Sequence, residues 1–284
     1  MSRLNQSRRD VLRVVGCAAA LAGVPPSPVL GQAPKTATFV LVHPAWHGAW
    51  YWKKVTPLLR ARGYEVYAPT LTGLGELTHL ARPEVGLGTH IEDVVNVLVY
   101  GDLRNVILVG NSSGGMVITG VAERAPERIA QVIYLDAFVP GHDQSLLDLL
   151  PPERRQAFHE FARSEGKGWL VPRFAPLPWE HIVRKLWGVN DDADVQWMLP
   201  RLVPTPLRHF TEPVQRTNPA NEKPLRTYVR CLQFPHPGFD QHAVMARRSP
   251  NWRYREMATP HLPPITHPRE LTALLVQLAD TSGS

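Results

Sequence analysis

Two adjacent serines, Ser112 and Ser113, lie in the stretch VILVGNSSGG, which covers residues 106–115. The residues around Ser112 read G-x-S-x-G, and an apolar run rich in β-branched residues precedes them. Between a strand and a helix this pattern is typical of a serine nucleophile on a sharp turn, where glycines let the backbone approach closely. If the pattern is centred on Ser113, its first glycine is lost. We therefore predict that Ser112 is a nucleophile, with a plain glycine-rich turn as the alternative.

A serine hydroxyl needs a base that takes its proton, and histidine commonly fills this role. His261 follows the last strand-like segment and precedes the last helical one. This position fits the chain order of nucleophile, acid and base that accompanies G-x-S-x-G. His267 is the competing candidate, but it directly precedes Pro268 and has the position of a helix-entry residue. We predict that His261 is the base.

Strand-like and helix-like segments alternate along the chain, which predicts an α/β fold with a mostly parallel sheet. Six strand-like segments predict strands, at residues 36–43, 64–69, 104–110, 129–136, 225–231 and 252–258, and the first is apolar or β-branched at nearly every residue. Helical patterns follow most of them, including a helix that is expected to open at Thr89 and to end at Gly101. Ser112 then lies where the third strand meets its helix.

The alternation stops over about residues 138–223, where amphipathic helical pieces are separated by prolines and no clear strand intervenes. This region predicts a helical cap inserted into the α/β domain. Its tryptophans could cover the site and favour a substrate with an apolar or aromatic acyl or alcohol group, or they could form the core of the insertion. These tryptophans are Trp169, Trp179, Trp187 and Trp197.

Residues 1–33 have the order of parts found in an export signal: a basic region, a short apolar stretch and small residues. The pair Arg8 and Arg9, inside SRRDVL, resembles the twin-arginine signal of bacteria. We therefore expect a periplasmic or secreted protein whose folded domain is residues 34–284. Without the leader only Cys231 remains, so no intramolecular disulfide is expected.

Charge and motifs argue against several classes of function. The formal net charge is +6, but the leader carries about half of it, and no basic run with interleaved aromatic residues follows. Nucleic-acid binding and stable membrane insertion are therefore not expected. His43 and His47 are four residues apart but not on a helix, and no nucleotide-binding glycine motif is present. We expect no metal and no cofactor, while the oligomeric state stays open.

Five stretches together resemble the α/β-hydrolase superfamily, and within it the branch of small bacterial carboxylesterases, plant salicylate-ester esterases and hydroxynitrile lyases. They are FVLVHPAWHGAWYW, APTLTGLGE, GNSSGGMVI, YLDAFVP and the terminal TPH…PREL. The resemblance implies an α/β-hydrolase fold, an acyl-enzyme mechanism and an oxyanion hole made by two backbone N–H groups. One would belong to Ser113 and the other to Ala45, in the loop where Pro44 replaces the usual glycine.

The acid that orients the base departs from this branch. Salicylate-esterase relatives carry an aspartate just after the strand that corresponds to residues 225–231, but here no carboxylate occurs before Asp240. Asp136 ends the strand that follows the nucleophile helix, and a carboxylate there can still reach the imidazole, because a triad is defined by its geometry. We favour Asp136 over Asp240. The prolines around His261, in TPHLPP, also depart from the family pattern.

These residues predict a serine hydrolase that cleaves small carboxylic esters with Ser112, His261 and Asp136. Hydroxynitrile cleavage is one alternative, because the resemblance includes lyases on the same scaffold. A ligand-binding protein without catalytic activity is the other, since the prolines could spoil the loop that carries the base. The sequence does not separate esters from lactones, amides or carbonates.

Overall fold

The computed structural model describes residues 37–280. The export signal predicted for residues 1–33 lies outside the described residues, so that prediction is untested.

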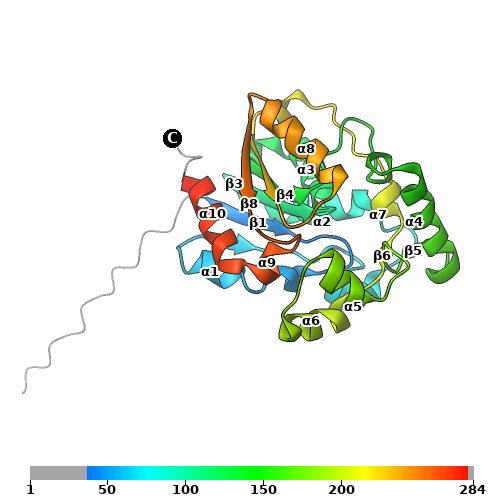
Figure 1. The fold of residues 1–284 in the computed structure, drawn as a ribbon. Coiled ribbons are helices and arrows are strands. Elements are labelled where there is room, and N and C mark those ends of the chain that lie inside the picture. Colours follow the sequence, from blue (N-terminus) through cyan, green and yellow to red (C-terminus); the bar gives the residue numbers. More distant parts are fainter. Residues whose placement is uncertain (1–36, 281–284) are drawn as a thin grey trace, which may run out of the picture. The chain divides into compact units, whose positions relative to one another are not determined.

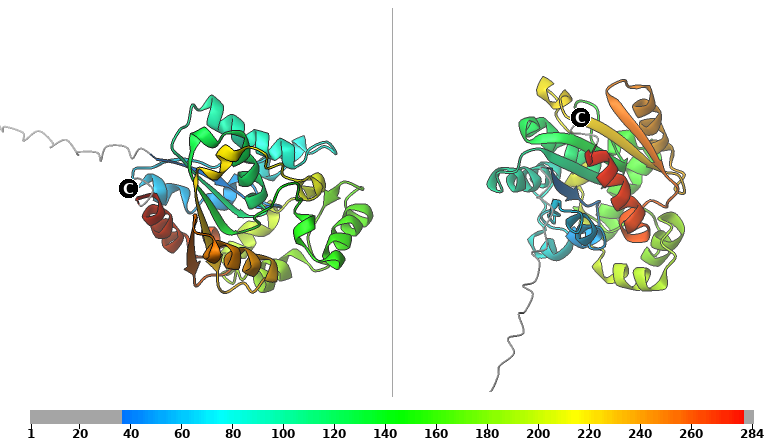
Figure 2. Two further views of the ribbon diagram at one scale, coloured as in Figure 1. Left: turned by 90° about the horizontal axis from the view of Figure 1, so that it is seen from above. Right: turned by 90° about the vertical axis from the view of Figure 1, so that its left-hand side faces the viewer.

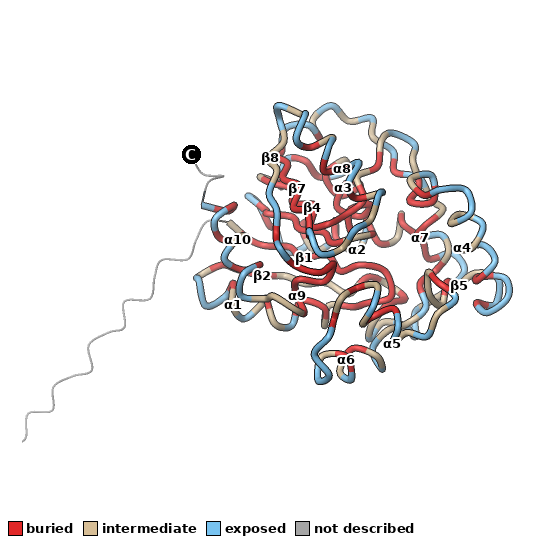
Figure 3. The backbone as a smooth tube through the Cα atoms, viewed as in Figure 1, coloured by how far each residue is buried: buried red, intermediate tan, exposed pale blue. Residues whose placement is uncertain are grey.

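A six-stranded parallel sheet forms the centre of the fold, with the strand order β2-β1-β3-β4-β7-β8 (Figure 1). Its strands are β1 (Thr38–Val42), β2 (Glu65–Tyr67), β3 (Val106–Ser112), β4 (Ile129–Ala137), β7 (Leu225–Cys231) and β8 (Trp252–Met257). All six strands predicted from the sequence are confirmed. The central strands β1, β3 and β4 are almost wholly buried, as their continuous apolar runs require in a sheet covered on both faces (Figure 3).

Helices cover both faces of the sheet (Figure 2). The helix α1 packs against the C-terminal helix α10, whereas α2 and α3 pack together and α8 covers β7 and β8. The bounds are α1 (Thr56–Arg60), α2 (Leu87–Tyr100), α3 (Gly114–Arg124), α8 (Pro237–Arg248), α9 (Pro263–Thr266) and α10 (Pro268–Asp280). The expected start of α2 at Thr89 is wrong by two residues, because Thr89 lies in the first turn and its Oγ1 accepts a hydrogen bond from the Gly86 N–H (3.5 Å).

A cap is inserted between β4 and β7. Its helices are α4 (Pro152–Glu165), α5 (Trp179–His181), α6 (Asp192–Met198) and α7 (Arg208–Thr211). The expectation that the cap contains no strand is wrong. The short strands β5 (Leu170–Val171) and β6 (Thr205–Pro206) pair antiparallel within it. Two-residue strands leave no periodic pattern in a sequence, and a proline such as Pro206 is rare inside a strand.

No helix within residues 37–280 combines the length and the apolar character needed to cross a membrane.

Candidate active site

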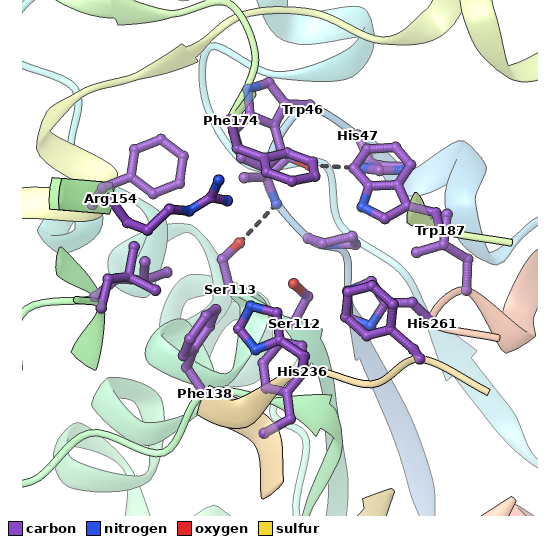
Figure 4. Close-up of a pocket in the computed structure, with 18 of the residues that line it drawn as sticks. Trp46, His47, Ser112, Ser113, Phe138, Arg154, Phe174, Trp187, His236 and His261 are labelled. Atoms are coloured by element: carbon purple, nitrogen blue, oxygen red, sulfur yellow. Dashed lines mark hydrogen bonds between the residues drawn. The ribbon is translucent and has the colours of Figure 1, made fainter. Parts of the chain in front are cut away.

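The sequence folds into a tight turn at Ser112, where β3 passes directly into α3. Ser112 has a φ of 54°, in the left-handed region that side chains rarely adopt. Glycines on both sides make this turn possible. A Cβ on Gly110 would lie 2.7 Å from the Gly114 carbonyl oxygen, and one on Gly115 would overlap the carbonyl oxygen of Phe138. The turn presents the Ser112 hydroxyl to a cavity, beside His236 and His261 (Figure 4).

His261 lies in the loop between β8 and α9, and its side chain is buried at the same cavity. Its Nδ1 is 2.7 Å from Asp136 Oδ2. When Nδ1 donates its hydrogen to this carboxylate, Nε2 is left without a proton and can accept one. The ring packs against two phenylalanines, with its centroid 4.3 Å from that of Phe234 and 5.3 Å from that of Phe239. The prolines of this loop are therefore compatible with an ordered histidine.

Asp136 reaches His261 because of an irregularity in β4. Asn111 pairs with Leu135 and Ser112 pairs with Ala137, so Asp136 is an extra residue in the register between β3 and β4. Its φ of 44° turns the backbone locally, as a β-bulge next to a functional site commonly does. The bulge aims the fully buried carboxylate at the carboxyl end of the sheet, toward the histidine.

Arg230 on β7 holds the other oxygen of the Asp136 carboxylate. Its Nη1 donates to Asp136 Oδ1 at 2.6 Å, and the Cys231 N–H donates to the same oxygen at 3.1 Å. Burial by itself would lower the pKa of Arg230, but Asp136 and Asp240 more than offset this effect and raise that pKa. Asp136 is therefore fixed by three partners on its two oxygens: Arg230, the Cys231 N–H and His261.

The competing candidates from the sequence lie elsewhere. Asp240 is on α8, where its Oδ1 accepts hydrogen bonds from Arg230 Nε (3.0 Å) and Nη2 (2.9 Å), and it makes no hydrogen bond to His261. His267 pairs with the Thr266 hydroxyl at the entry to α10 and does not line the cavity. The structure thus brings Ser112, His261 and Asp136 to one site and leaves Asp240 behind Arg230.

The two predicted oxyanion donors also meet at this site, with one complication. Ala45 follows β1 and Ser113 follows Ser112, and both line the cavity. The Ala45 N–H already donates to the Ser113 Oγ at 2.8 Å. A substrate carbonyl oxygen that uses the Ala45 N–H must therefore replace this hydroxyl as its acceptor.

Trp46, next to Ala45, fastens the loop after β1 to the cap. Its backbone N–H donates to Thr205 Oγ1 (2.8 Å), its Nε1 donates to the Val171 carbonyl (2.9 Å), and its carbonyl accepts from the Val203 N–H (3.0 Å). Thr205 and Val171 belong to β6 and β5, so the two strands that the sequence did not reveal position the predicted oxyanion loop.

The cavity is mainly aromatic, and its empty space, including the mouth, is about 650 Å³. Eight aromatic side chains besides its histidines line it: Trp46, Phe138, Phe158, Phe174, Trp187, Phe210, Phe234 and Phe239. Of the four cap tryptophans, only Trp187 lines the cavity. Trp179 packs behind it against Trp46, and Trp197 packs edge-on against Trp50, so the cap tryptophans serve both the site and the cap's own packing.

Sequence reasoning missed three residues of the site. Arg230 is one of two arginines in a predicted strand, and the sequence does not show that a bulge in β4 brings Asp136 to it. His236, in the loop before α8, lines the cavity, and burial lowers its pKa to about 4. Arg154 lines the cavity from the cap helix α4, and nothing in its spacing distinguishes it from its neighbours.

Metal ligands are not gathered at this site. Across residues 37–280, no group of three or more His, Cys, Asp or Glu side chains is arranged so that it could hold an ion.

Comparison with known families gives the same fold. The family described as "Alpha/beta hydrolase family" matches residues 39–274, which includes the serine turn, the cap and His261. The chain belongs to the α/β-hydrolase family.

Several relatives of this α/β-hydrolase bear the names of esterases. A carbendazim hydrolyzing esterase of Nocardioides sp. is 52% identical over 115 residues, which are 40% of this chain and 48% of that protein. The similarity to that protein thus spans about half of its length. Methyl jasmonate esterase 1 of Vitis vinifera is 28% identical over 86% of this chain and 97% of its own.

Among solved structures, an extracellular α/β-hydrolase from a Paenibacillus species superimposes with a TM-score of 0.74. It is 25% identical and covers 85% of this chain and 98% of its own. Its description states structural and functional homology to tobacco salicylic acid binding protein 2. This similarity extends over the sheet and the cap.

Proposed function

We propose that this α/β-hydrolase is a serine esterase that cleaves small carboxylic esters with an apolar or aromatic group. The observation that carries the proposal is that Ser112 and His261 face one aromatic cavity while Asp136 holds His261 from behind. Ser112 faces the cavity from a strained turn, and His261 lies beside it with its Nδ1 held by the buried Asp136. The esterase names of several relatives support the same class of reaction.

In the proposed mechanism, Ser112 Oγ attacks the acyl carbon while His261 Nε2 takes the hydroxyl proton. Asp136 accepts the hydrogen bond from Nδ1–H, holds the ring in the required tautomer and stabilises the imidazolium ion. The tetrahedral intermediate then expels the alcohol, which takes the proton from His261, and leaves an acyl group on Ser112. Water attacks this acyl group with His261 again as base, which releases the acid and restores the serine.

Two backbone N–H groups are proposed to stabilise the oxyanion, those of Ala45 and Ser113. Each such donor is typically worth about 3–4 kcal/mol of transition-state stabilisation. The Ser113 N–H lies at the start of α3, where the helix dipole adds partial positive charge. When the substrate binds, its carbonyl oxygen replaces the Ser113 hydroxyl as the acceptor of the Ala45 N–H.

Active-site labelling tests this proposal directly. A fluorophosphonate probe should modify the wild-type protein on the peptide that contains Ser112, as located by mass spectrometry. Ser112→Ala should lose the label and about 10⁴-fold or more of the rate with a p-nitrophenyl ester. Ser164→Ala, on an exposed part of α4, is the matched control and should keep both.

Three results would overturn the proposal. These are no label on the folded protein, a label on another residue, or equal ester hydrolysis by Ser112→Ala and the wild type.

A further inference from the structure

Arg154 brings a positive charge into a cavity that is otherwise aromatic and apolar. It lies on the cap helix α4, and its guanidinium extends toward the middle of the cavity near Ser113, on the side away from His261 (Figure 4). The guanidinium carbon is 5.6 Å from the centroid of the Phe174 ring. This distance permits a cation–π contact that fixes the direction of the side chain.

The guanidinium of Arg154 has no polar partner among residues 37–280. It makes neither a hydrogen bond nor an ion pair with them, although it is half-buried. Other arginines of the same helix are paired. Arg155 donates to the carbonyl oxygens of Leu150 (2.8 Å) and Asp148 (2.9 Å), and Arg163 lies 3.4 Å from Glu160. Arg154 therefore lacks a polar partner because its side chain enters the cavity, and not because arginines on this helix are generally unpaired.

The surroundings of Arg154 oppose its charge. Burial lowers the pKa of Arg154, and the attraction of Glu153 offsets this effect only in part. The described residues that line the cavity include no Asp or Glu. Arg154 is the only Lys or Arg among them. A guanidinium offers five N–H donors in a planar fork, and the partial removal of these donors from water costs free energy unless an acceptor replaces the water.

We propose that Arg154 binds a carboxylate carried by the ester substrate, at the end of an aromatic ring remote from the scissile bond. The planar fork of the guanidinium matches the two oxygens of a carboxylate. The aromatic walls accept the ring between this contact and Ser112. The substrate class is then an aromatic monoester with a free carboxylate, and Arg154 is a specificity-determining residue. The reaction part of this inference rests on the proposed function; the binding part does not.

Binding of simple acids tests the anion contact without catalysis. Calorimetric titration should show that benzoate binds the wild type more tightly than benzamide, its neutral isostere. Arg154→Met should weaken benzoate binding about 10-fold to 100-fold, the range of a hydrogen-bonded charge, and leave benzamide unchanged. Arg163→Met, on an exposed arginine of the same helix, should bind benzoate as the wild type does. Equal benzoate binding by Arg154→Met and the wild type would refute the contact.

Matched esters test the substrate class. The wild type should hydrolyse the monomethyl esters of isophthalate or terephthalate with a lower KM than the corresponding methyl toluates, which carry a methyl group in place of the carboxylate. Arg154→Met should lose this preference through KM, while Arg154→Lys, which keeps the charge without the fork, should keep part of it. A preference for the toluates, or an unchanged preference in Arg154→Met, would refute the assignment.

The two experiments separate this inference from the proposed function. If the toluates are hydrolysed without a preference for the charged esters, the esterase proposal stands and the role of Arg154 fails. If no ester is hydrolysed but benzoate binding depends on Arg154, the anion site stands and the esterase proposal fails.

Discussion

The carboxylate of Asp136 reaches His261 from the end of β4. A bulge at the end of β4 aims it, and Arg230 on the neighbouring strand holds its second oxygen. The charge on Arg230 compensates the buried carboxylate, which would otherwise be costly to desolvate. Asp240, the alternative candidate from the sequence, contacts the guanidinium of Arg230 and so helps to hold the partner of Asp136 in place.

Asp136→Asn should lower kcat/KM for a p-nitrophenyl ester by about 10³-fold to 10⁴-fold. The asparagine amide would donate to His261 Nδ1, which forces the tautomer whose Nε2 carries the proton and cannot act as base. Asp240→Asn is the control and should cost less than about tenfold, since Asp240 has no hydrogen bond to His261. Steady-state kinetics of both variants, with melting curves to show that they fold, check this prediction. A larger loss in Asp240→Asn would reverse the assignment.

At the scale of elements, the site depends on how closely β3, α3 and the end of β4 approach one another. Gly115, in the first turn of α3, lies against the backbone of Phe138 just beyond β4. The contact leaves no room for a side chain, and the partner is a backbone carbonyl that cannot move aside without shifting β4. The same end of β4 carries Asp136, so the packing of α3 against β4 also sets the position of this carboxylate.

Gly115→Ala should therefore destabilise the protein by about 1–3 kcal/mol, as overpacking typically does, and should reduce ester hydrolysis further by displacing Asp136. The matched control is Gly88→Ala in α2, where a new Cβ would lie 3.6 Å from Glu212 Oε2, an ordinary contact. The control should leave stability unchanged or raise it by up to about 1 kcal/mol, because alanine favours a helix over glycine. Urea unfolding of both variants measures the difference, and equal effects at the two positions would contradict this account of the turn.

At the scale of the whole molecule, several buried histidines make stability depend on pH. Burial lowers the pKa of His43 and of His242 to about 4 and that of His47 to about 3, against an ordinary value of 6.5. His43 is also tied to the fold as a neutral ring, because its Nε2 accepts a hydrogen bond from the Leu71 N–H at 3.1 Å. A proton on that nitrogen would remove the bond.

Stability should fall as the pH drops from about 6.5 toward 4. In this window the unfolded chain binds protons at these histidines and the folded chain does not, so acid favours unfolding by about 1.4 kcal/mol per pH unit for each such histidine. The loss begins below the pKa of the unfolded state and levels off below the folded-state pKa values. Urea midpoints measured between pH 7.5 and 5 check the sign, and a constant midpoint would contradict it. His242→Gln should reduce the slope, whereas the exposed His159→Gln should not.

The sequence by itself determined the local parts of this protein. The six strands, the turn at Ser112 and the place of His261 before the last helix follow from apolar runs, glycines and prolines, because short-range sterics and burial fix such features within a few residues. The same reasoning placed a cap between β4 and β7. It could not reveal the strands β5 and β6, because a strand of two residues is too short to show the alternation of apolar and polar residues.

Only the tertiary structure decided which residues meet. The choice of Asp136 over Asp240 depends on a one-residue bulge, which is a matter of register between strands and leaves no mark in composition. The Ala45 N–H bonds to Ser113, and Trp46 bonds to Thr205 in the cap; both contacts join residues far apart in the chain. Arg154 likewise reaches a cavity whose other lining residues come from distant parts of the chain. Such contacts arise from packing in three dimensions. The turn at Ser112 could therefore be predicted from its neighbours, whereas the bulge that brings Asp136 to His261 and the place of Arg154 in the cavity could not.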